Sequence, residues 1–560
     1  MQGAHAGQSR STRKRDTSKG ESMRVLLVCY DNDSFSVIFP QGLAAVAAVL
    51  QQEGYEVSVW DQDVNHLPSN ALTEYLDNNE FDVLGISLIA GYWQYQKLLE
   101  LSKAIAESKN RPSYYILGGY GPAPEPEFFL KKTNADIVVI GEGEDTTREL
   151  FSAIANNQSV AGVNGIAYRD GNQVIMTPER ALIPEESLGD PDRVPMPAYD
   201  LFDMSVYRLM REPNCRKSNF IIPLLSGRGC PFKCNFCFRL DKGHRKRSVE
   251  AILDEIGWLM SNYQINYFQF SDDLLMTSKR RTVEIAEAFL HWQEKNKKRF
   301  KWSCNGRLNF VTPEVLHVME KSGCVFINYG IEAFDDESLK AQDKALTCAT
   351  IERGVQETIK TSIAPGLNFI WGNIGETEDT LQKAVDFLTK YDPHSQLRTI
   401  RPVTPYPGSP LYYHCIEKGL LDRDNPAEDF YERKHLNSDL LAVNLTPYSD
   451  DEFHAILAKA NKTLLDNYFD YQRNRYHEQT DELYFETNTK FRGYRQGNLR
   501  DGMETASEDG VESSESNGDD TDHDQLVAAA QFETERRLIP VVAERLAGLR
   551  RKGNFSPPVG

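Results

Sequence analysis

The 560-residue sequence has no apolar run of the roughly 18 residues that a membrane-spanning helix needs, and its first residues lack the apolar stretch of a signal peptide. Its nine cysteines are too few for a disulfide scaffold. Basic side chains are in the minority, with 63 Lys and Arg against 82 Asp and Glu, which disfavours a general attraction to nucleic acid. We therefore expect a cytoplasmic protein with no membrane span and no nucleic-acid partner.

The excess of acidic residues is concentrated near the end of the chain. Residues 501–524 contain ten Asp or Glu and no Lys or Arg, which is about half of the net charge of -19. This tract is rich in Ser and Gly and has no hydrophobic period, so it cannot bury a core. We predict an acidic disordered tail over 496–560, with a candidate terminal helix at 525–552, and a disordered basic arm over 1–22.

Short apolar runs alternate with helix-period stretches from residue 23 onward. Continuous apolar strands separated by amphipathic helices are typical of a parallel sheet that is covered on both faces. The fold class that we predict is α/β, beginning with a doubly wound Rossmann-like domain over 23–157. Its five strand candidates lie at 24–30, 56–60, 82–90, 114–119 and 136–144.

No GxGxxG motif follows the first of these strands, which disfavours a nicotinamide or flavin dinucleotide site. Ligands of doubly wound sheets bind outside the carboxyl ends of the strands. Glycines gather at these ends, at Gly118, Gly119, Gly141 and Gly143. Each of them alone could simply form a turn, but their joint placement favours a close approach of the backbone to a ligand.

A second alternating series follows. Strand and helix units in series predict a partial (β/α)6 TIM-like barrel over 216–419, whose chemistry should lie at the carboxyl ends of its strands. We interpret 158–215 as a connecting segment and 420–495, which is rich in Tyr and Phe, as a helical C-terminal cap. The six strand candidates of the barrel lie at 221–225, 266–270, 300–304, 325–334, 366–372 and 397–403.

Three cysteines follow the first strand of the second series with the spacing C-x3-C-x2-C, at Cys230, Cys234 and Cys237. Three thiolates on one tight loop can bind three corners of an iron-sulfur cube and leave its fourth iron free for a small molecule. A structural zinc site with His244 as the fourth ligand is an alternative, but closed zinc sites usually pair C-x2-C with a distant second pair. The other six cysteines are scattered, and we interpret them as small buried hydrophobic residues.

The motif CPFKCNFC, after a strand that opens a β/α series, resembles the cysteine loop of the radical S-adenosylmethionine superfamily. The preceding domain is similar to the cobalamin-binding domain that is often fused to it. The similarity extends from about residue 23 to about residue 467. Its pieces occur in the family order, and they include FPQGLAAVAAVLQQEGYEV, GISLI, LGGYGP, DIVVIGEGE, HRKRSVEAILDEI, FSDD, YGIEAF and TPYPGSPLY.

The resemblance implies a 4Fe-4S cluster held by the three cysteines, with the amino and carboxylate groups of S-adenosylmethionine on the remaining iron. It places Phe236, directly before the third cysteine, against the adenine of that cofactor. Glu332 ends the fourth barrel strand, where the family commonly contacts the ribose. An ion pair at the barrel rim is the alternative interpretation of this residue.

Two further groups of polar residues follow barrel strands. Ser271, Asp272 and Asp273 end the second strand, where the family contacts the methionyl amino group, and a carboxylate complements an ammonium group. The alternative is that the two aspartates cap the next helix. Asn305 and Arg307 end the third strand, and the resemblance implies that they reach the cofactor carboxylate or the substrate.

The first domain departs from one pattern of cobalamin proteins. Many of them carry D-x-H-x-x-G after the first strand, with a histidine that ligates cobalt from below, but this sequence reads DNDSFS at 31–36. His66 follows the second strand at the wrong spacing, and we interpret it as a surface loop residue. The resemblance implies a cobalamin site without a histidine beneath the cobalt, as in the methyltransferase branch of the family, with Ser87, Gly118 and Gly119 in that site.

The resemblance implies a cobalamin-dependent radical S-adenosylmethionine enzyme, and a methyltransferase in particular. A 5'-deoxyadenosyl radical would act on a small-molecule substrate, a biosynthetic intermediate, and methylcobalamin would supply the methyl group, since protein side chains alone cannot do this chemistry. The electron would come from an external donor such as a flavodoxin or ferredoxin. Two alternatives stay open: an oxidative cyclase or other rearranging enzyme without methyl transfer, and a non-catalytic cobalamin-binding regulatory protein.

Overall fold

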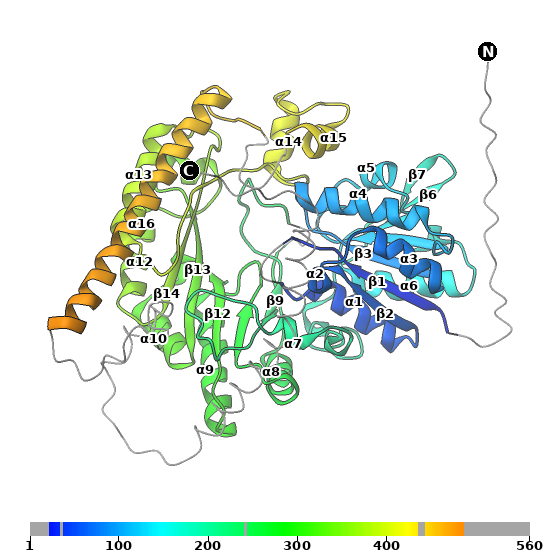
Figure 1. Ribbon diagram of the computed structural model, residues 1–560, viewed down its shortest axis with the longest axis horizontal. Helices are drawn as coiled ribbons and strands as arrows, with labels where there is room; N and C mark the ends of the chain where they lie inside the picture. The colour runs from blue at the N-terminus through cyan, green and yellow to red at the C-terminus, as the bar shows by residue number, and fades with distance from the viewer. Residues whose placement is uncertain (1–21, 34–36, 240–242, 435–442, 486–560) are drawn as a thin grey trace, which may run out of the picture.

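The computed structural model describes residues 22–33, 37–239, 243–434 and 443–485. Two α/β units lie side by side, and helices from the C-terminal part of the chain pack on both units (Figure 1). The basic arm predicted over 1–22 lies outside the described residues except for its last residue. The acidic tail and the helix predicted within 496–560 lie outside them entirely.

The first unit contains a sheet with the strand order β2-β1-β3-β4-β5-β6-β7. Alternate residues of β1 enter different cores, with Val25 and Leu27 in one and Leu26 and Val28 in the other. Both faces of the sheet are therefore covered, as its continuous apolar runs predict. The first five strands are parallel and correspond to the five predicted ones: β1 (Arg24–Cys29), β2 (Glu56–Asp61), β3 (Val83–Ser87), β4 (Tyr114–Gly118) and β5 (Ile137–Val139).

Helices cover this sheet on both faces. α1 (Gln41–Gln52) and α6 (Gly143–Ala155) pack in the core that contains Val25. On the opposite face lie α3 (Asn70–Asn78), α4 (Tyr92–Glu107) and α5 (Pro126–Lys132), whereas the one-turn helix α2 (Gln62–Asn65) follows β2. The strand order changes direction between β1 and β3, and this switch point is where doubly wound sheets bind ligands.

An antiparallel hairpin extends the first sheet beyond β5. Its strands are β6 (Ile166–Asp170) and β7 (Gln173–Met176), and Gly171 in the turn between them has a φ of 60°. The hairpin lies inside the segment 158–215, which we interpreted as a connection. The rest of that segment forms the 3-10 turns 160–162, 185–187 and 199–201 and the short helix α7 (Met204–Tyr207).

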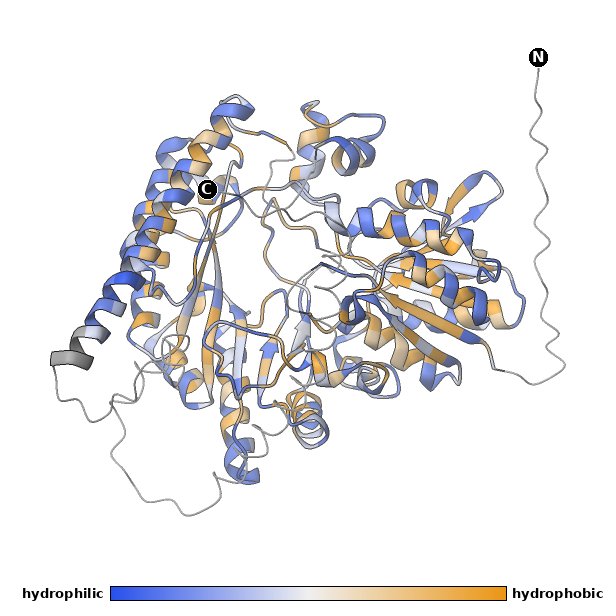
Figure 2. Ribbon diagram, viewed as in Figure 1, coloured by the Kyte–Doolittle hydropathy of each residue, from blue (hydrophilic) through white to orange (hydrophobic). Residues whose placement is uncertain are grey.

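The second unit is an open sheet of six parallel strands in the order β15-β14-β13-β12-β11-β8, which curls into a half-barrel. All six correspond to predicted strands, and the predicted α/β fold class is confirmed. Figure 2 shows the hydrophobic strands inside both units and hydrophilic residues on the outer helix faces. The strands are β8 (Ile221–Leu224), β11 (Tyr267–Phe270), β12 (Lys301–Gly306), β13 (Cys324–Glu332), β14 (Ala364–Trp371) and β15 (Arg401–Pro402).

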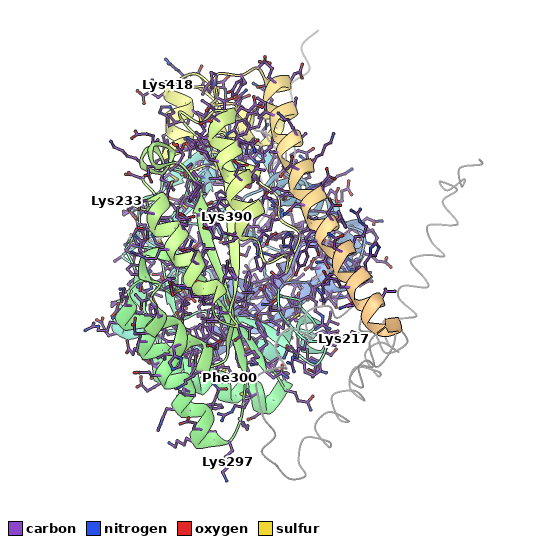
Figure 3. The ribbon with its side chains drawn as sticks, turned by 90° about the vertical axis from the view of Figure 1, so that its left-hand side faces the viewer. Lys217, Lys233, Lys297, Phe300, Lys390 and Lys418 are labelled. Atoms are coloured by element: carbon purple, nitrogen blue, oxygen red, sulfur yellow. The ribbon has the colours of Figure 1, made fainter. Side chains whose placement is uncertain are left out.

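The barrel helices cover the convex face of this sheet. Ser248 caps the first of them, and its side chain accepts a hydrogen bond from the backbone N–H of Ala251 at 3.2 Å. Figure 3 looks onto these helices, with Lys297 just after the end of α9 and Lys390 in the last turn of α13. The helices are α8 (Val249–Tyr263), α9 (Lys279–Asn296), α10 (Pro313–Lys321), α11 (Asp336–Ala341), α12 (Cys348–Ile359) and α13 (Glu378–Tyr391), with the 3-10 turn 308–310.

The C-terminal helices contact both units. α14 (Pro410–Glu417) and the π-helix η6 (Asp429–Lys434) share a core with α4 and α5 of the first unit, and Glu428 of α15 (Pro426–Glu428) forms an ion pair with Lys132 of α5. The long helix α16 (Asp450–Phe485) instead packs on α13 of the barrel. The helices of the C-terminal part therefore contact both units.

Candidate functional site

A cavity of about 930 Å3 lies at the carboxyl ends of the first sheet. Ser87 at the end of β3, Gly118 at the end of β4 and Gly119 directly after it line one side of the cavity. Ser271 and Asp273, which follow β11 of the barrel, line it as well. The same cavity is therefore in contact with both units.

Gly119, directly after β4, is needed because two strand ends approach each other closely there. The backbone N–H of Leu88 donates to the carbonyl oxygen of Gly118 at 2.9 Å. Gly119 has a φ of 91°, and a Cβ at this position would come within 2.6 Å of the carbonyl oxygen of Leu88. No side chain can be added here, so the backbone itself forms this part of the cavity wall.

The loop after β1 brings no histidine to the cavity. Asn32 and Asp63 line it, and the backbone N–H of Asn32 donates to Asp63 Oδ1 at 2.9 Å. His66 is half-buried rather than a free surface residue, since its Nδ1 lies 3.0 Å from Asp31 Oδ2. Among the described residues that line the cavity, none is a histidine.

The cysteine loop lies between two short paired strands, β9 (Gly227–Arg228) and β10 (Arg245–Lys246). Cys234 is buried, whereas Cys230 and Cys237 are half-buried. The backbone N–H of Cys237 donates to the carbonyl oxygen of Cys234 at 3.3 Å, which makes a tight turn. The sequence spacing therefore corresponds to one compact loop.

Backbone hydrogen bonds fix this loop to the barrel and to the C-terminal helices. The N–H of Asn235 donates to the carbonyl oxygen of Gln342 at 3.0 Å, and the N–H of Leu411 donates to the carbonyl oxygen of Asn235 at 2.8 Å. The side chains of Asn235 and Asn373 also exchange hydrogen bonds, at 3.0 and 3.2 Å. Three distant parts of the chain thus position one residue next to Cys234.

Two cations lie beside the cysteines. A hydrogen bond from Cys237 lowers the pKa of Cys234, and the charges of Lys344 and Arg307 lower it further. Burial raises the pKa of Cys230. Arg307 also stacks on Phe232 of the loop, with Cζ 3.5 Å from the ring centroid. Positive charge next to thiolates compensates their negative charge, as a thiolate-bound metal cluster requires.

The arrangement of side chains gives no support to the zinc alternative. Within the described ranges, no three His, Cys, Asp or Glu side chains converge closely enough to hold one metal ion. A zinc site needs four ligands around a single point. His244 lies beside Gly227 and faces the charges of Arg281 and Glu185.

The two aspartates after β11 have different environments. Asp272 is buried and accepts hydrogen bonds from the backbone N–H and the hydroxyl of Ser226, both at 2.9 Å. Burial raises the pKa of Asp272 to about 6. Asp273 is exposed to the cavity. The helix-capping alternative is wrong, because Ser278 caps α9 through the backbone N–H of Arg281.

Glu332 forms the rim ion pair that we considered as its alternative interpretation. Its Oε1 lies 3.0 Å from Lys344 Nζ, and both side chains are largely buried. Glu332 has a φ of 73°, at a break in the register of β13 with β14, which is a strained conformation for a residue with a side chain. Lys344 Nζ also lies 5.7 Å from the centroid of the Phe236 ring.

Sequence reasoning missed several residues of this site. Lys344 bridges Glu332 and Phe236, but it stands in the stretch AQDKAL, which has no recognisable motif. Gln342 and Asn373 hold Asn235 through contacts between residues far apart in the chain. Nothing in the local sequence pattern indicates these contacts.

Comparison with protein-family models gives two matches. Residues 28–151 match the B12 binding domain, and residues 224–388 match the radical SAM superfamily. Together they contain the cysteine loop and most of the residues that line the cavity. The chain belongs to the cobalamin-binding radical S-adenosylmethionine family. It is a radical S-adenosylmethionine enzyme, and its cofactors are a 4Fe-4S cluster, S-adenosylmethionine and cobalamin.

Several curated proteins resemble this radical S-adenosylmethionine enzyme over most of its length. An uncharacterized methyltransferase of Pyrococcus horikoshii is 27% identical over 75% of this chain and 86% of its own. The cytidylyl-2-hydroxyethylphosphonate methyltransferase of Streptomyces wedmorensis is 27% identical over 76% and 85% of the two chains. The anaerobic magnesium-protoporphyrin IX monomethyl ester cyclase of Rubrivivax gelatinosus is 25% identical over 68% and 66%.

Solved structures share the fold of this enzyme. The radical S-adenosylmethionine methyltransferase TsrM from Kitasatospora setae, with cobalamin and a 4Fe-4S cluster bound, has a TM-score of 0.58, 20% identity and coverage of 71% of this chain and 75% of its own. The cobalamin-dependent enzyme OxsB, with aqua-cobalamin and S-adenosylmethionine bound, has a TM-score of 0.61, 18% identity and coverage of 94% and 81%. At these identities the likeness concerns the fold.

The residues of this enzyme fit both cofactors. Arg307 Nη2 is buried and, within the described part of the chain, has no hydrogen-bond partner, so a cationic donor next to the cysteines can still bind a carboxylate. The cavity offers exposed backbone at Gly119 and room beside Ser87. Among the described helices, none combines the length and apolar character of a membrane span.

Proposed function

We propose that this enzyme transfers a methyl group to a carbon or phosphorus atom of a small-molecule substrate. One observation carries the proposal: the cavity that fits cobalamin is also lined by Ser271 and Asp273 of the barrel, close to the cysteine loop. When bound, the cluster with S-adenosylmethionine supplies a carbon radical, and cobalamin supplies the methyl group. A substrate in this cavity would lie between the two cofactor sites.

Cys230, Cys234 and Cys237 would hold three corners of the cluster, and Arg307 and Lys344 would balance their charge. The tight turn from Cys234 to Cys237 and the burial of Cys234 support this role. The unpaired Nη2 of Arg307 would bind the carboxylate of S-adenosylmethionine. An external electron donor such as a flavodoxin or ferredoxin would reduce the cluster.

The remaining predicted cofactor contacts divide between two roles. Asp273 and Ser271 are exposed to the cavity and would bind the methionyl amino group. The carboxylate of Asp272 is already used by Ser226, so we assign it to anchoring the start of the cysteine loop. In the same region, Phe236 would lie on the adenine and Glu332, held by Lys344, would bind the ribose.

Ser87, Gly118 and Gly119 would form the cobalamin site on the first unit. Their support is that all three line the cavity and that Gly119 presents bare backbone to it. Among the described residues that line the cavity there is no histidine, so this part of the lining offers no histidine ligand for cobalt.

Anaerobic turnover with S-adenosylmethionine that carries a deuterated methyl group tests the proposal. The reconstituted holoenzyme, with reductant and a metabolite extract as the source of acceptors, should form 5'-deoxyadenosine and a small molecule that carries the label. Cys230→Ala should abolish 5'-deoxyadenosine, whereas Cys215→Ala, a cysteine outside the loop, should leave it unchanged. Formation of 5'-deoxyadenosine with no labelled product would instead indicate radical chemistry without methyl transfer, as in a cyclase.

A further inference from the structure

A group of four charged side chains joins the cysteine loop to the loop that follows β5. Arg228, two residues before Cys230, donates from Nη1 to Glu142 Oε1 at 2.6 Å and from Nη2 to Glu144 Oε1 at 2.5 Å. Arg245 donates to Glu142 Oε2 at 2.9 Å. The two arginines are direct neighbours on the β9–β10 pair, so both strands that flank the cysteine loop are fastened to the first unit.

The four side chains are well shielded from water. The side chains of Glu142 and Glu144 are each 6% exposed, Arg245 is 12% exposed and Arg228 is 19% exposed. Two cations face two anions, so the group is neutral as a whole. Burial opposes the charged form of Glu142, but Arg245 and Arg228 hold its pKa below the ordinary value. Moving one of these side chains away would leave a buried charge without compensation, so the contacts within the group hold its geometry.

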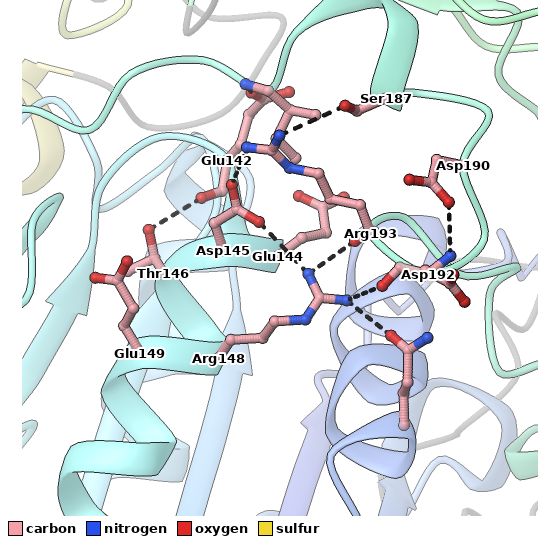
Figure 4. A network of polar contacts seen from close by, with 12 residues as sticks. Glu142, Glu144, Asp145, Thr146, Arg148, Glu149, Ser187, Asp190, Asp192 and Arg193 are labelled. Carbon is pink, nitrogen blue, oxygen red and sulfur yellow. Dashed lines mark hydrogen bonds and ion pairs between the residues drawn. The ribbon is translucent and has the colours of Figure 1, made fainter.

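The glutamates are themselves held rigidly. They lie at the start of α6, and Figure 4 shows the network that surrounds them. Arg193 contacts Asp145 of this helix at 2.7 Å, and Arg148 donates to the carbonyl oxygen of Arg193 at 2.8 Å. The backbone N–H of Ile183 donates to Glu142 Oε2 at 2.7 Å. The glutamates that bind Arg228 are thus held in place by further contacts within the first unit.

The same residues form a wall of the cavity. Glu142, Glu144 and Arg228 line it, together with Gly141 and Gly229 on either side of them. The loop that carries Glu142 belongs to the cobalamin side, and the loop that carries Arg228 continues directly into Cys230. A shift of this ion-pair group would therefore change the separation between the cobalamin cavity and the cysteines.

We propose that Arg228 is a positioning residue that, through Glu142 and Glu144, sets the distance between the cobalamin site and the iron-sulfur site. This role rests on the proposed function, because that function needs both cofactors on opposite sides of one substrate. Reaction between two held groups is steep in distance, and a displacement of about 1 Å can cost about a hundredfold in rate. The ion-pair group fixes the relative position of the two units next to the cysteine loop, where the distance between the two cofactor sites is set.

The test uses the full-length holoenzyme and the variants Arg228→Gln and Arg228→Lys. The matched control is Arg180→Gln, which breaks the ion pair of Arg180 with Glu149 on the same helix α6; Arg180 also donates to the carbonyl oxygen of Asn164, so these contacts lie within the first unit. Iron and cobalt contents are measured first. The relaxation of the cob(II)alamin EPR signal is then measured with the cluster oxidised and reduced, because a reduced cluster speeds this relaxation as the inverse sixth power of the distance.

In the wild type and in Arg180→Gln, we expect the reduced cluster to enhance cob(II)alamin relaxation equally. Arg228→Gln should keep its iron and cobalt, but the relaxation enhancement should fall several-fold. Its kcat should fall roughly ten- to a hundredfold, while its KM for S-adenosylmethionine stays unchanged. Arg228→Lys should recover part of both. Wild-type enhancement in Arg228→Gln at full metal content would overturn the proposal.

If Arg228→Gln fails to hold its metals, the same EPR measurement is made on Glu144→Gln. This variant leaves the contact between Arg228 and Glu142 in place. A partial loss of the relaxation enhancement in Glu144→Gln would support the positioning role of Arg228, and an unchanged enhancement would overturn it. If the wild type binds both cofactors but transfers no methyl label, the proposed function fails while the EPR comparison still decides the role of Arg228.

Discussion

Glu376 is a buried carboxyl group, and within the described residues its hydrogen-bond donors are all uncharged. Its Oε2 accepts hydrogen bonds from the backbone N–H groups of Gly372 and Asn373, both at 2.8 Å, and its Oε1 accepts one from Gln342 Nε2 at 3.1 Å. Burial and the charge of Asp335 raise the pKa of Glu376 to about 7, although these hydrogen bonds oppose the shift. The native state therefore binds a proton that the unfolded state has already released.

The first prediction concerns the pH dependence of stability at this residue. Because the pKa is about 4.5 unfolded and about 7 folded, the contribution of Glu376 to stability falls as pH rises through that window. Glu376→Gln removes the loss, and the free carbonyl of Gln342 can accept from the new amide once Gln342 flips. In urea titrations, the stability of the variant relative to the wild type should increase by about 2.5 kcal/mol from pH 5 to pH 8. A constant difference across that range would contradict this account.

Gly408 lies where three parts of the molecule meet. Its φ is 87°, and a Cβ there would come within 2.5 Å of Phe238, which follows Cys237, and within 2.9 Å of Pro124 in the first unit. Gly419 has a similar φ of 71°, but open space surrounds it. The two glycines therefore share the conformational cost of a substitution but not the steric one.

The second prediction compares Gly408→Ala with Gly419→Ala. Both should lose about 1 kcal/mol of stability from the left-handed backbone. Gly408→Ala should lose a further 1–3 kcal/mol or so from overpacking, and it should lower the iron content because Phe238 adjoins the cysteine loop. Urea midpoints and iron analysis measure both effects. Equal midpoints for the two variants would show that the loop tolerates the extra methyl group.

At the scale of single residues, the sequence identified the cysteine loop because its spacing is local and carries one specific chemistry. It also placed Ser271 and Asp273 at a strand end that proves to line the cavity. It could not separate Asp272 from Asp273, because burial against Ser226 depends on a contact 46 residues away. Lys344 stayed hidden for the same reason.

Among the elements, α16 is packed on the barrel near its start and more exposed further along. Phe453 in its first part is fully buried and stacks on Trp371 of β14, with ring centroids 4.6 Å apart. Phe469, further along the same helix, is 58% exposed. The N-terminal half of α16 therefore fastens the helix to the barrel.

The third prediction uses this difference along α16. Phe453→Ala should cost about 3–5 kcal/mol, because it removes a buried aromatic ring and leaves a cavity against Trp371. Phe469→Ala on the same helix should change stability by less than about 0.5 kcal/mol. Urea denaturation followed by circular dichroism compares the two. Equal effects would mean that the packing of α16 on β14 contributes little.

The strands were predictable as elements because each is a continuous buried run, and helix caps such as Ser248 have a local signature. The hairpin β6–β7 escaped prediction, since its strands are short, half polar and separated by a two-residue turn that also suits a loop. The helical segment 420–495 was predicted as a C-terminal cap without the surface that it covers; η6 packs on α4 and α5, whereas α16 packs on α13. Composition alone does not indicate which surface a helix covers.

At the scale of the whole molecule, the chain is two α/β units joined by a loop contact, by the C-terminal helices and by a few polar bridges. Gln41 of α1 accepts from the Ser271 hydroxyl at 3.0 Å and donates to the carbonyl oxygen of Pro223 at 3.2 Å, which links the first helix to two barrel strands. Tyr412 donates to Glu125 at 3.0 Å across another part of the interface. The order of the two units was predictable from sequence, but their facing geometry depends on these nonlocal contacts.

The central claim is that one chain holds an iron-sulfur cluster and cobalamin at separate sites that meet at one cavity. Metal analysis of the anaerobically reconstituted protein, combined with its absorption spectrum, tests this claim most directly. We predict about four irons and one cobalt per chain, with Cys234→Ala losing the iron but keeping the cobalt, and with Cys348→Ala, a cysteine on α12, keeping both. Zinc in place of iron, or full iron content in Cys234→Ala, would contradict the account.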